Sequence, residues 1–282
     1  MGMQVNTNVS ALNSYRNLSN TQNDLAKSLE KLSSGLRINH AADDAAGLAI
    51  SQGLQSQVGG LTVASRNAQD GISVIQTAEG SLSEVQTILQ RVRDLAVQAG
   101  NDSNNATSRD AIKTEVTALG AELTRIGTNA NFNGTKLLDG TGGAAADGKL
   151  TFQIGAGSTL SDQISVQMTD ITALASGITT LAATGFASAS AAATSIATVD
   201  GNITTISTAR ADLGAQQNRF ESVIRNLSVS TENLTAAKSR ITDTDMAAEM
   251  VKYTRSNILS QAGTAMLAQA NQGNQGVLQL LR

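Results

Sequence analysis

The spacing of apolar residues predicts a largely helical chain whose two ends each carry one apolar stripe. Downstream of Asn257, and again near the amino terminus, apolar or small residues recur at steps of three and four, the repeat of one helix face. A helix with so narrow a stripe is marginal in water, so both ends need partners, from each other or from other copies of the chain. We expect an assembly surface made of Val5, Val9, Leu12, Leu18, Leu25, Leu29, Leu32, Leu259, Ala262, Met266, Val277 and Leu280.

A second pattern, in the middle of the chain, predicts two long helices that share one core. Apolar residues stay on one helix face from about Gly47 to Ala99, and from Val199 onward they recur every seven residues. A seven-residue repeat sustained over this distance is typical of a coiled coil. We expect the two helices to lie side by side, with a core of Ile72, Ile75, Leu82, Leu89, Ile206, Leu213, Phe220, Leu227 and Leu234.

The segment between these helices changes character. Residues 112–126 carry a shorter amphipathic pattern, which predicts a helix folded back on the first long one. Apolar and polar residues alternate in 150–154 and in 164–168, which predicts a β-hairpin over about residues 149–169. Residues 172–195 are rich in Ala, Ser, Thr and Gly, a composition that predicts a weakly structured, variable insertion.

Together these elements predict a mainly α fold, an elongated folded-back helical bundle or coiled coil with one small β-hairpin region. Residues 1–42 and 242–282 form a terminal coiled-coil domain. Residues 43–171 and 196–241 form a helical rod domain that holds the hairpin, and residues 172–195 are a short variable insertion. The first helix begins after the cap candidates at residues 6–8 and ends at Ser34, because Gly35 suits the left-handed position that follows a helix.

Composition argues against an enzyme. The chain has no proline, no cysteine and a net charge of -3, so it offers neither thiolate chemistry nor a basic footprint for nucleic acid. His40 is the only histidine, which excludes a two-histidine metal site within one chain. We interpret Asp43 and Asp44 as first-turn carboxylates and Asp243 as a helix-start residue. We therefore expect no cofactor, no metal and no catalytic residue, and the absence of a long apolar run predicts no membrane span.

Ordered motifs along the chain carry a family resemblance. They are Leu32–Asn39, Ala41–Ser51, Gln69–Ser73, Gln76–Gly80, Leu89–Gln98, Asn131–Leu138, Asn233–Ala237, Ser239–Ile241, Leu267–Gln272 and Leu280–Arg282. In this order and over residues 3–170 and 196–282, they resemble bacterial flagellin, the filament protein of the flagellum. Residues 172–195 fall where that family varies most, and because this segment is short, the resemblance implies that the outer domains of longer flagellins are absent.

The resemblance implies a structural subunit that self-assembles into the helical filament used for swimming, through terminal helices that order on polymerisation. It implies that the terminal coiled coil is an inner domain that lines the filament channel. It also implies an extracellular, flagellar location reached through the flagellum's own export apparatus without a cleaved signal peptide, which replaces the cytoplasmic location that composition alone suggests. The implied partners are an export chaperone, hook-associated proteins and cap proteins.

In flagellins that a vertebrate innate immune receptor recognises, the contact positions match Arg91, Leu95 and Glu115, whereas Asp94 stands where Glu is more frequent. Three alternatives remain. A hook–filament junction protein shares flagellin-like ends. A flagellin with an inserted zinc peptidase needs a His-Glu-x-x-His helix, and no histidine follows His40. A non-flagellar secreted coiled-coil protein would not need paired ends.

Overall fold

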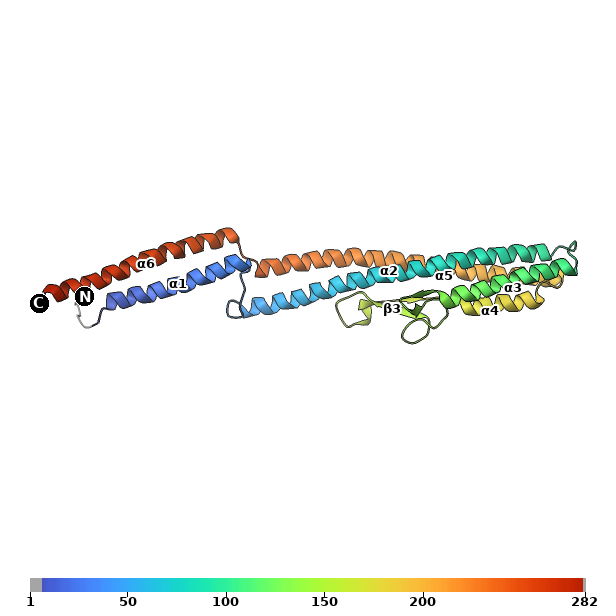
Figure 1. Cartoon of the computed structure of the whole chain (residues 1–282), viewed down its shortest axis with the longest axis horizontal. Helices are drawn as coiled ribbons and strands as arrows, with labels where there is room; N and C mark the ends of the chain where they lie inside the picture. The colour runs from blue at the N-terminus through green and yellow to red at the C-terminus, as the bar shows by residue number, and fades with distance from the viewer. Residues whose placement is uncertain (1–6, 281–282) are drawn as a thin grey trace. The chain divides into compact units, whose positions relative to one another are not determined.

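The computed structural model describes residues 7–280, with side chains up to residue 273. The fold is mainly α, as predicted (Figure 1). The chain divides into two compact units. Of the described residues, those up to Gln57 and from Asn233 onward form unit 1, and those from Val58 to Glu232 form unit 2. The helices are α1 (Val9–Ser34), α2 (Ala45–Ala99), α3 (Ala106–Asn129), α4 (Ile171–Thr184), α5 (Ala189–Thr242) and α6 (Met246–Leu280).

Unit 1 is built on α1 and α6, which pack against each other in antiparallel directions (Figure 1). Asn8 caps α1 by accepting a hydrogen bond from the backbone N–H of Ala11 at 3.0 Å, and its side-chain amide donates to the carbonyl of Ala270 at 2.9 Å. The helix ends at Gly35, whose φ of 72° is the left-handed conformation predicted from the sequence.

The segments that leave α1 and enter α6 are tied together by backbone hydrogen bonds. The N–H of Arg37 donates to the carbonyl of Thr242 at 2.6 Å, and the N–H of Thr244 donates to the carbonyl of Gly35 at 2.9 Å. The prediction that Asp243 starts the last helix is wrong. Asp245 caps α6, since it accepts from the backbone N–H groups of Ala247 and Ala248 at 2.9 and 3.1 Å, whereas Asp243 directly follows the end of α5 at Thr242.

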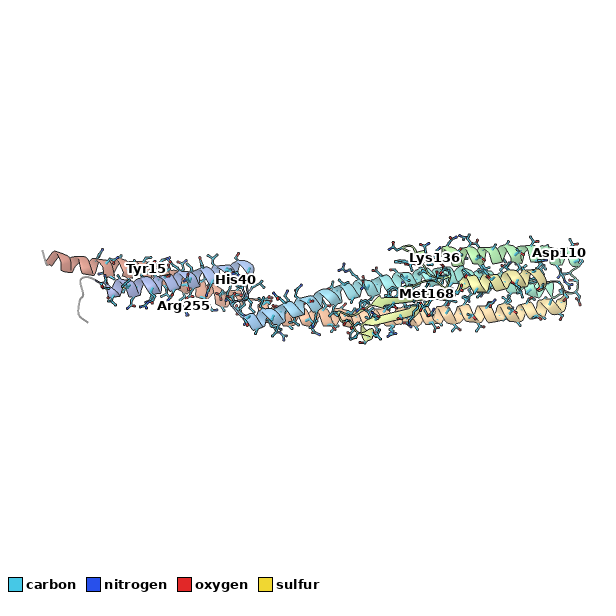
Figure 2. The ribbon with its side chains drawn as sticks, turned by 90° about the horizontal axis from the view of Figure 1, so that it is seen from below. Tyr15, His40, Asp110, Lys136, Met168 and Arg255 are labelled. Atoms are coloured by element: carbon cyan, nitrogen blue, oxygen red, sulfur yellow. The ribbon has the colours of Figure 1, made fainter. Side chains whose placement is uncertain are left out.

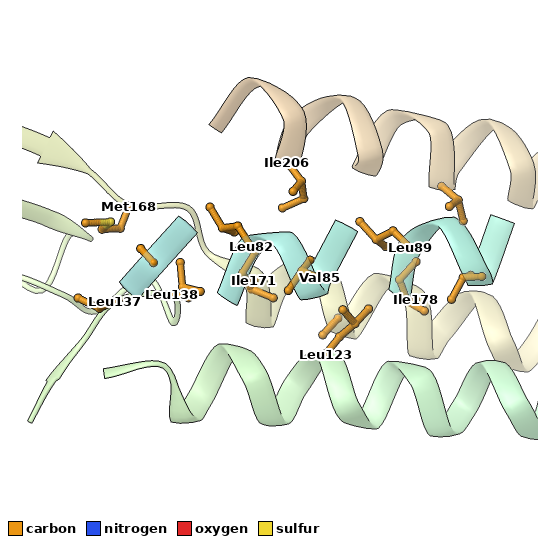
Figure 3. Close-up of a cluster of buried hydrophobic side chains, with 14 of the residues drawn as sticks. Leu82, Val85, Leu89, Leu123, Leu137, Leu138, Met168, Ile171, Ile178 and Ile206 are labelled. Atoms are coloured by element: carbon orange, nitrogen blue, oxygen red, sulfur yellow. The ribbon is translucent and has the colours of Figure 1, made fainter. Parts of the chain in front are cut away.

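Unit 2 holds the main hydrophobic core, which α2 and α5 share with α3 and α4. Leu82, Val85 and Leu89 of α2 lie between Ile206 of α5 on one side and Leu123 of α3 on the other (Figure 3). Antiparallel pairing of α2 with α5 is fixed by polar contacts at the edge of the core. They are the ion pairs of Arg93 with Asp200 at 2.6 Å and of Arg210 with Glu79 at 3.3 Å.

The predicted β-hairpin is confirmed. Strand β3 (Lys149–Gln153) pairs with β4 (Gln163–Gln167) in antiparallel register, and a short 3-10 turn at Leu160–Asp162 precedes β4. The structure adds a second, smaller ladder of β1 (Asn131–Phe132) and β2 (Thr135–Lys136). Asn133 and Gly134 join these strands with φ of 49° and 83°, the conformation of a type I′ turn. This ladder was not predicted from the sequence, although an Asn-Gly pair is typical of such a turn.

The prediction that residues 172–195 are weakly structured is wrong. Helix α4 covers Ile171–Thr184, and α5 already begins at Ala189. Within the Ala-rich composition, Ile171, Ala175, Ile178 and Ala182 are spaced by three and four and are all buried against α3. Asp170 caps α4 by accepting from two backbone N–H groups, so a short apolar stripe and one cap are enough to order the segment.

Candidate interaction surface

The contact between α1 and α6 is a narrow seam of mostly small and polar side chains. On α1 the inward residues follow a three–four spacing, and Leu18 and Ser28 are the buried ones. Leu18 fits against Gly263 of α6, where an added Cβ would lie 3.2 Å from the leucine Cδ1. The other seam residues are at least partly covered and are Ala11, Ser14, Thr21, Leu25, Leu32, Tyr253, Ser256, Ser260, Leu267 and Ala270.

One buried polar contact sets the register of this seam. The hydroxyl of Ser28 donates to the Oε1 of Glu249 at 2.6 Å, and both side chains are buried. Lys252 donates to the other carboxylate oxygen at 3.0 Å. The hydrogen bond from Ser28, more than the attraction of Lys252, lowers the pKa of Glu249 below its ordinary value of 4.5 and outweighs the opposing effect of burial.

The faces of α1 and α6 that point away from the seam are apolar and exposed. On α1, Val9 is 57% exposed, Leu12 is 59% exposed, and Tyr15, labelled in Figure 2, is 64% exposed. On α6 a set of exposed residues lies outside the seam, and Arg255 among them is labelled in Figure 2. They line a shallow groove made of Met250, Val251, Thr254, Arg255, Ile258 and Leu259. Such a continuous apolar face is typical of a surface that another protein covers.

Comparison with known proteins identifies the family. Residues 5–142 match the bacterial flagellin N-terminal helical region, and residues 196–281 match the bacterial flagellin C-terminal helical region. The chain belongs to the flagellin family. It is 51% identical to "Flagellin" of Bacillus subtilis (strain 168), with 99% of this chain and 100% of that relative covered. It is 46% identical to "Flagellar filament 33 kDa core protein" of Treponema phagedenis, again with 99% and 100% covered.

A solved structure of a "putative flagellar hook-associated protein" from Vibrio parahaemolyticus is also similar, with a TM-score of 0.57 over 71% of this chain and 100% of that one. Its 14% identity shows a shared fold alone. The much higher identity to flagellins over nearly the whole chain favours a filament subunit over the hook–filament junction alternative. As a flagellin, the chain is a structural subunit of the flagellar filament.

The predicted assembly residues of this flagellin divide between the seam and the exposed faces. Leu18, Leu25 and Leu32 are seam residues. The exposed ones are Val9, Leu12, Leu29, Leu259, Ala262 and Met266. Val5 lies outside the described residues, and so do the side chains of Val277 and Leu280. Sequence reasoning missed the first turns of the α6 face, although Met246, Met250, Thr254 and Ile258 recur at steps of four, because it followed the stripe only downstream of Asn257.

Most of the predicted rod-core residues are buried. Ile72 and Leu234 are half-buried, and the buried ones are Ile75, Leu82, Leu89, Ile206, Leu213, Phe220 and Leu227.

The residues matched to an immune-receptor contact differ in their exposure to solvent. Arg91 of α2 donates to Glu115 of α3 at 2.8 Å, and both are accessible. Leu95 is 2% exposed, so its assignment to that surface is wrong: it belongs to the core beneath.

The polar residues singled out in the sequence have structural contacts. His40 pairs with Glu30 at 2.7 Å, and its side chain is 70% exposed. Asp43 accepts from the backbone N–H groups of His40 and Asn39, which holds its pKa below 3.8. Asp44 caps α2 through the N–H of Gly47 at 2.8 Å. Over residues 7–280, no three His, Cys, Asp or Glu side chains gather where they could bind a metal ion. No helix in the same range is apolar over a length that would span a bilayer.

Proposed function

We propose that this flagellin polymerises with copies of itself through the outward faces of α1 and α6, and that these helices become ordered as neighbouring copies cover them. One observation carries the proposal. Among the described residues, unit 1 buries only Leu18 and Ile38 as large apolar side chains. Unit 2 exposes only Val63, Val97, Leu160 and Val229 among its large hydrophobic residues, so most of the exposed apolar surface is concentrated in unit 1.

The energetics of unit 1 support coupling between order and assembly. Fixing a residue's backbone costs about 1–2 kcal/mol, whereas burying one large apolar side chain contributes about 1.5–3 kcal/mol. Two helices that bury so few large side chains between them do not offset the cost of ordering more than fifty residues by packing alone. We infer that the conformation described for α1 and α6 is the one adopted in the polymer. A head-to-tail contact that does not close generates the open helix of subunits that a filament needs.

The same exposed faces support the finer partner assignments. Residues 1–42 and 242–282 are assigned to an inner domain that lines the filament channel. An apolar face on α6 needs cover before polymerisation, which favours an export chaperone at this helix. The proposal also includes export through the flagellar apparatus without a cleaved signal peptide and contact with hook-associated and cap proteins. It further includes an immune-receptor contact at Arg91 and Glu115.

Seeded growth of the purified chain tests the central claim. We expect soluble subunits to extend filament fragments and to gain helicity as they do so, because α1 and α6 order on incorporation. A Leu259→Ser variant removes an exposed apolar side chain from α6, and we expect it to raise the free-subunit concentration needed for growth about tenfold. The matched control is the Val229→Ser variant, because Val229 is 58% exposed but lies in unit 2. The proposal would be refuted by equal helicity in subunit and filament. It would also be refuted if the Leu259→Ser variant grew at the same free-subunit concentration as the unaltered chain.

A further inference from the structure

Three of the chain's six methionines are exposed on α6, outside the seam. Met246 is 47% exposed, Met250 is 50% exposed and Met266 is 62% exposed. Met250 lines the apolar groove with Ile258 and Leu259. None of the three belongs to the seam, where α6 presents residues such as Glu249 and Gly263 to α1. The thioethers therefore lie on the surface proposed to meet a neighbouring copy, and the contact between α1 and α6 does not depend on them.

Exposed thioethers are open to a specific covalent change. Hydrogen peroxide transfers one oxygen atom to the methionine sulfur, which is oxidised to a sulfoxide, while the peroxide is reduced to water. The product is a polar group at a position that was apolar. The chain contains no cysteine, so methionine is the only sulfur that such an oxidant can reach. Met168, in contrast, is 3% exposed and belongs to the same buried core of unit 2 as Leu137 and Leu138 (Figure 3).

We propose that Met246, Met250 and Met266 are oxidation-sensitive positions on the exposed surface of α6, and that their conversion to sulfoxides by peroxide prevents a free subunit from joining the filament. The inference rests on the proposed function, since it assumes that the outward face of α6 is covered by another copy. A sulfoxide buried against an apolar neighbour has no hydrogen-bond partner there, and an unpaired buried polar group is unfavourable. Oxidation therefore weakens the contact with the neighbour and leaves each unit's own packing unchanged.

The exposure of these methionines differs between free and assembled subunits. A subunit already in the filament has this face covered, so its thioethers are shielded, whereas a free subunit presents all three to solvent. Peroxide thus acts on subunits before they are incorporated and spares assembled ones. A methionine sulfoxide reductase, with a thiol as the electron donor, reduces the sulfoxide to the thioether and releases the oxygen as water, so the block is reversible.

Peroxide treatment followed by seeded growth tests the proposal with the full chain. Peptide mass spectrometry measures the oxygen added at each methionine, and unfolding of unit 2 reports whether the fold survives. We expect the oxidised chain to need at least about a tenfold higher free-subunit concentration for growth. We expect a Met246→Leu, Met250→Leu, Met266→Leu variant to grow equally well before and after treatment, because leucine keeps the face apolar and does not react. A Met168→Leu variant is the matched control and should lose growth on treatment as the unaltered chain does.

The outcomes separate this inference from the function on which it rests. Failure of the untreated chain to extend seeds would overturn the proposed polymerisation and this inference with it. Growth of the untreated chain, together with undiminished growth after all three exposed methionines are oxidised, would overturn the oxidation site alone. An equal loss of growth in the triple leucine variant would do the same, because the effect would then come from other residues. Oxidation of the three methionines at equal rates in filaments and in free subunits would contradict the claimed shielding.

Discussion

Two glycines of α2 provide a test of how the core of unit 2 is packed. Gly71 is buried, and a Cβ added there would lie 3.0 Å from two ring atoms of Phe220 and 3.4 Å from Phe152. Gly80 lies in the same helix, is exposed, and has no atom within 4 Å of an added Cβ. The substitutions Gly71→Ala and Gly80→Ala are therefore chemically identical changes in one helix that meet opposite surroundings.

The expected free energies have opposite signs. In a helix interior, alanine is more favourable than glycine by about 0.5–1 kcal/mol, and both variants receive this gain. Only Gly71→Ala adds a methyl group to a filled core, which costs about 1–3 kcal/mol when neighbours cannot move. Phe220 is fully buried and is held edge-to-face by Phe152, with ring centroids 5.5 Å apart and an interplanar angle of 87°. Because the Phe220 ring is fully buried and packed against Phe152, we expect the cost to exceed the gain.

Thermal unfolding of the free subunit, followed by circular dichroism, measures both changes. We expect Gly80→Ala to raise the Tm of unit 2 and Gly71→Ala to lower it, by about 2–4 °C for each kcal/mol in a unit of this size. A double-mutant cycle with Phe220→Leu locates the cause, since the smaller side chain leaves room for the methyl group and should reduce the penalty of Gly71→Ala. Shifts of the two glycine variants in the same direction, or a penalty independent of Phe220→Leu, would refute the packing argument.

Other predictions follow from the caps, the seam and one turn. Ser28→Ala leaves the buried carboxylate of Glu249 without its main hydrogen bond, so filaments of the variant should dissociate at lower temperature than unaltered filaments, a loss of about 1.5–3 kcal/mol per subunit. The pKa of Glu249 is lowered below 4.5 in the folded chain, so the stabilisation by this carboxylate is complete above pH 4.5 and is lost as the pH falls through the lower folded pKa. Filaments should therefore dissociate in acid, and Ser28→Ala filaments should dissociate at a higher pH than unaltered ones. Light scattering measures both transitions. Asn105→Ala removes the cap that accepts from Ser108 at 2.8 Å and should lower the unfolding free energy of unit 2 by about 1 kcal/mol in urea titrations. Gly134→Ala places a side chain at φ 83° and should cost about 1 kcal/mol or more in the same titration, and no change would argue against the type I′ turn.

The helices of this flagellin could be predicted from sequence because their apolar repeats are long and their ends carry clear signals. Gly35, for instance, marks the end of α1 by needing a left-handed φ. Helix α4 escaped prediction because its stripe is short and half alanine, so that composition resembles a flexible linker until α3 is present to cover it. Leu95 illustrates a different limit. It belongs to a motif with Arg91, one turn away, yet only tertiary contacts show that one side chain is accessible and the other is buried.

The polar residues within the seam of unit 1 explain why α1 and α6 depend on neighbouring copies for most of their apolar burial. Had α1 and α6 placed large apolar side chains at every seam position, each buried leucine would contribute about 1.5–3 kcal/mol, and the pair would be stable without neighbours. Ser14, Thr21 and Ser28 occupy such positions instead, while Val9, Leu12, Leu29, Ile258 and Leu259 stay exposed outside the seam. The inward contacts therefore specify register, through Ser28 and Glu249, while most of the burial energy is gained only when another copy arrives. On this reasoning, replacing seam hydroxyls with leucine should make the free subunit more helical and lessen the gain in helicity on assembly, which links the polarity of the seam directly to the subunit's dependence on its neighbours.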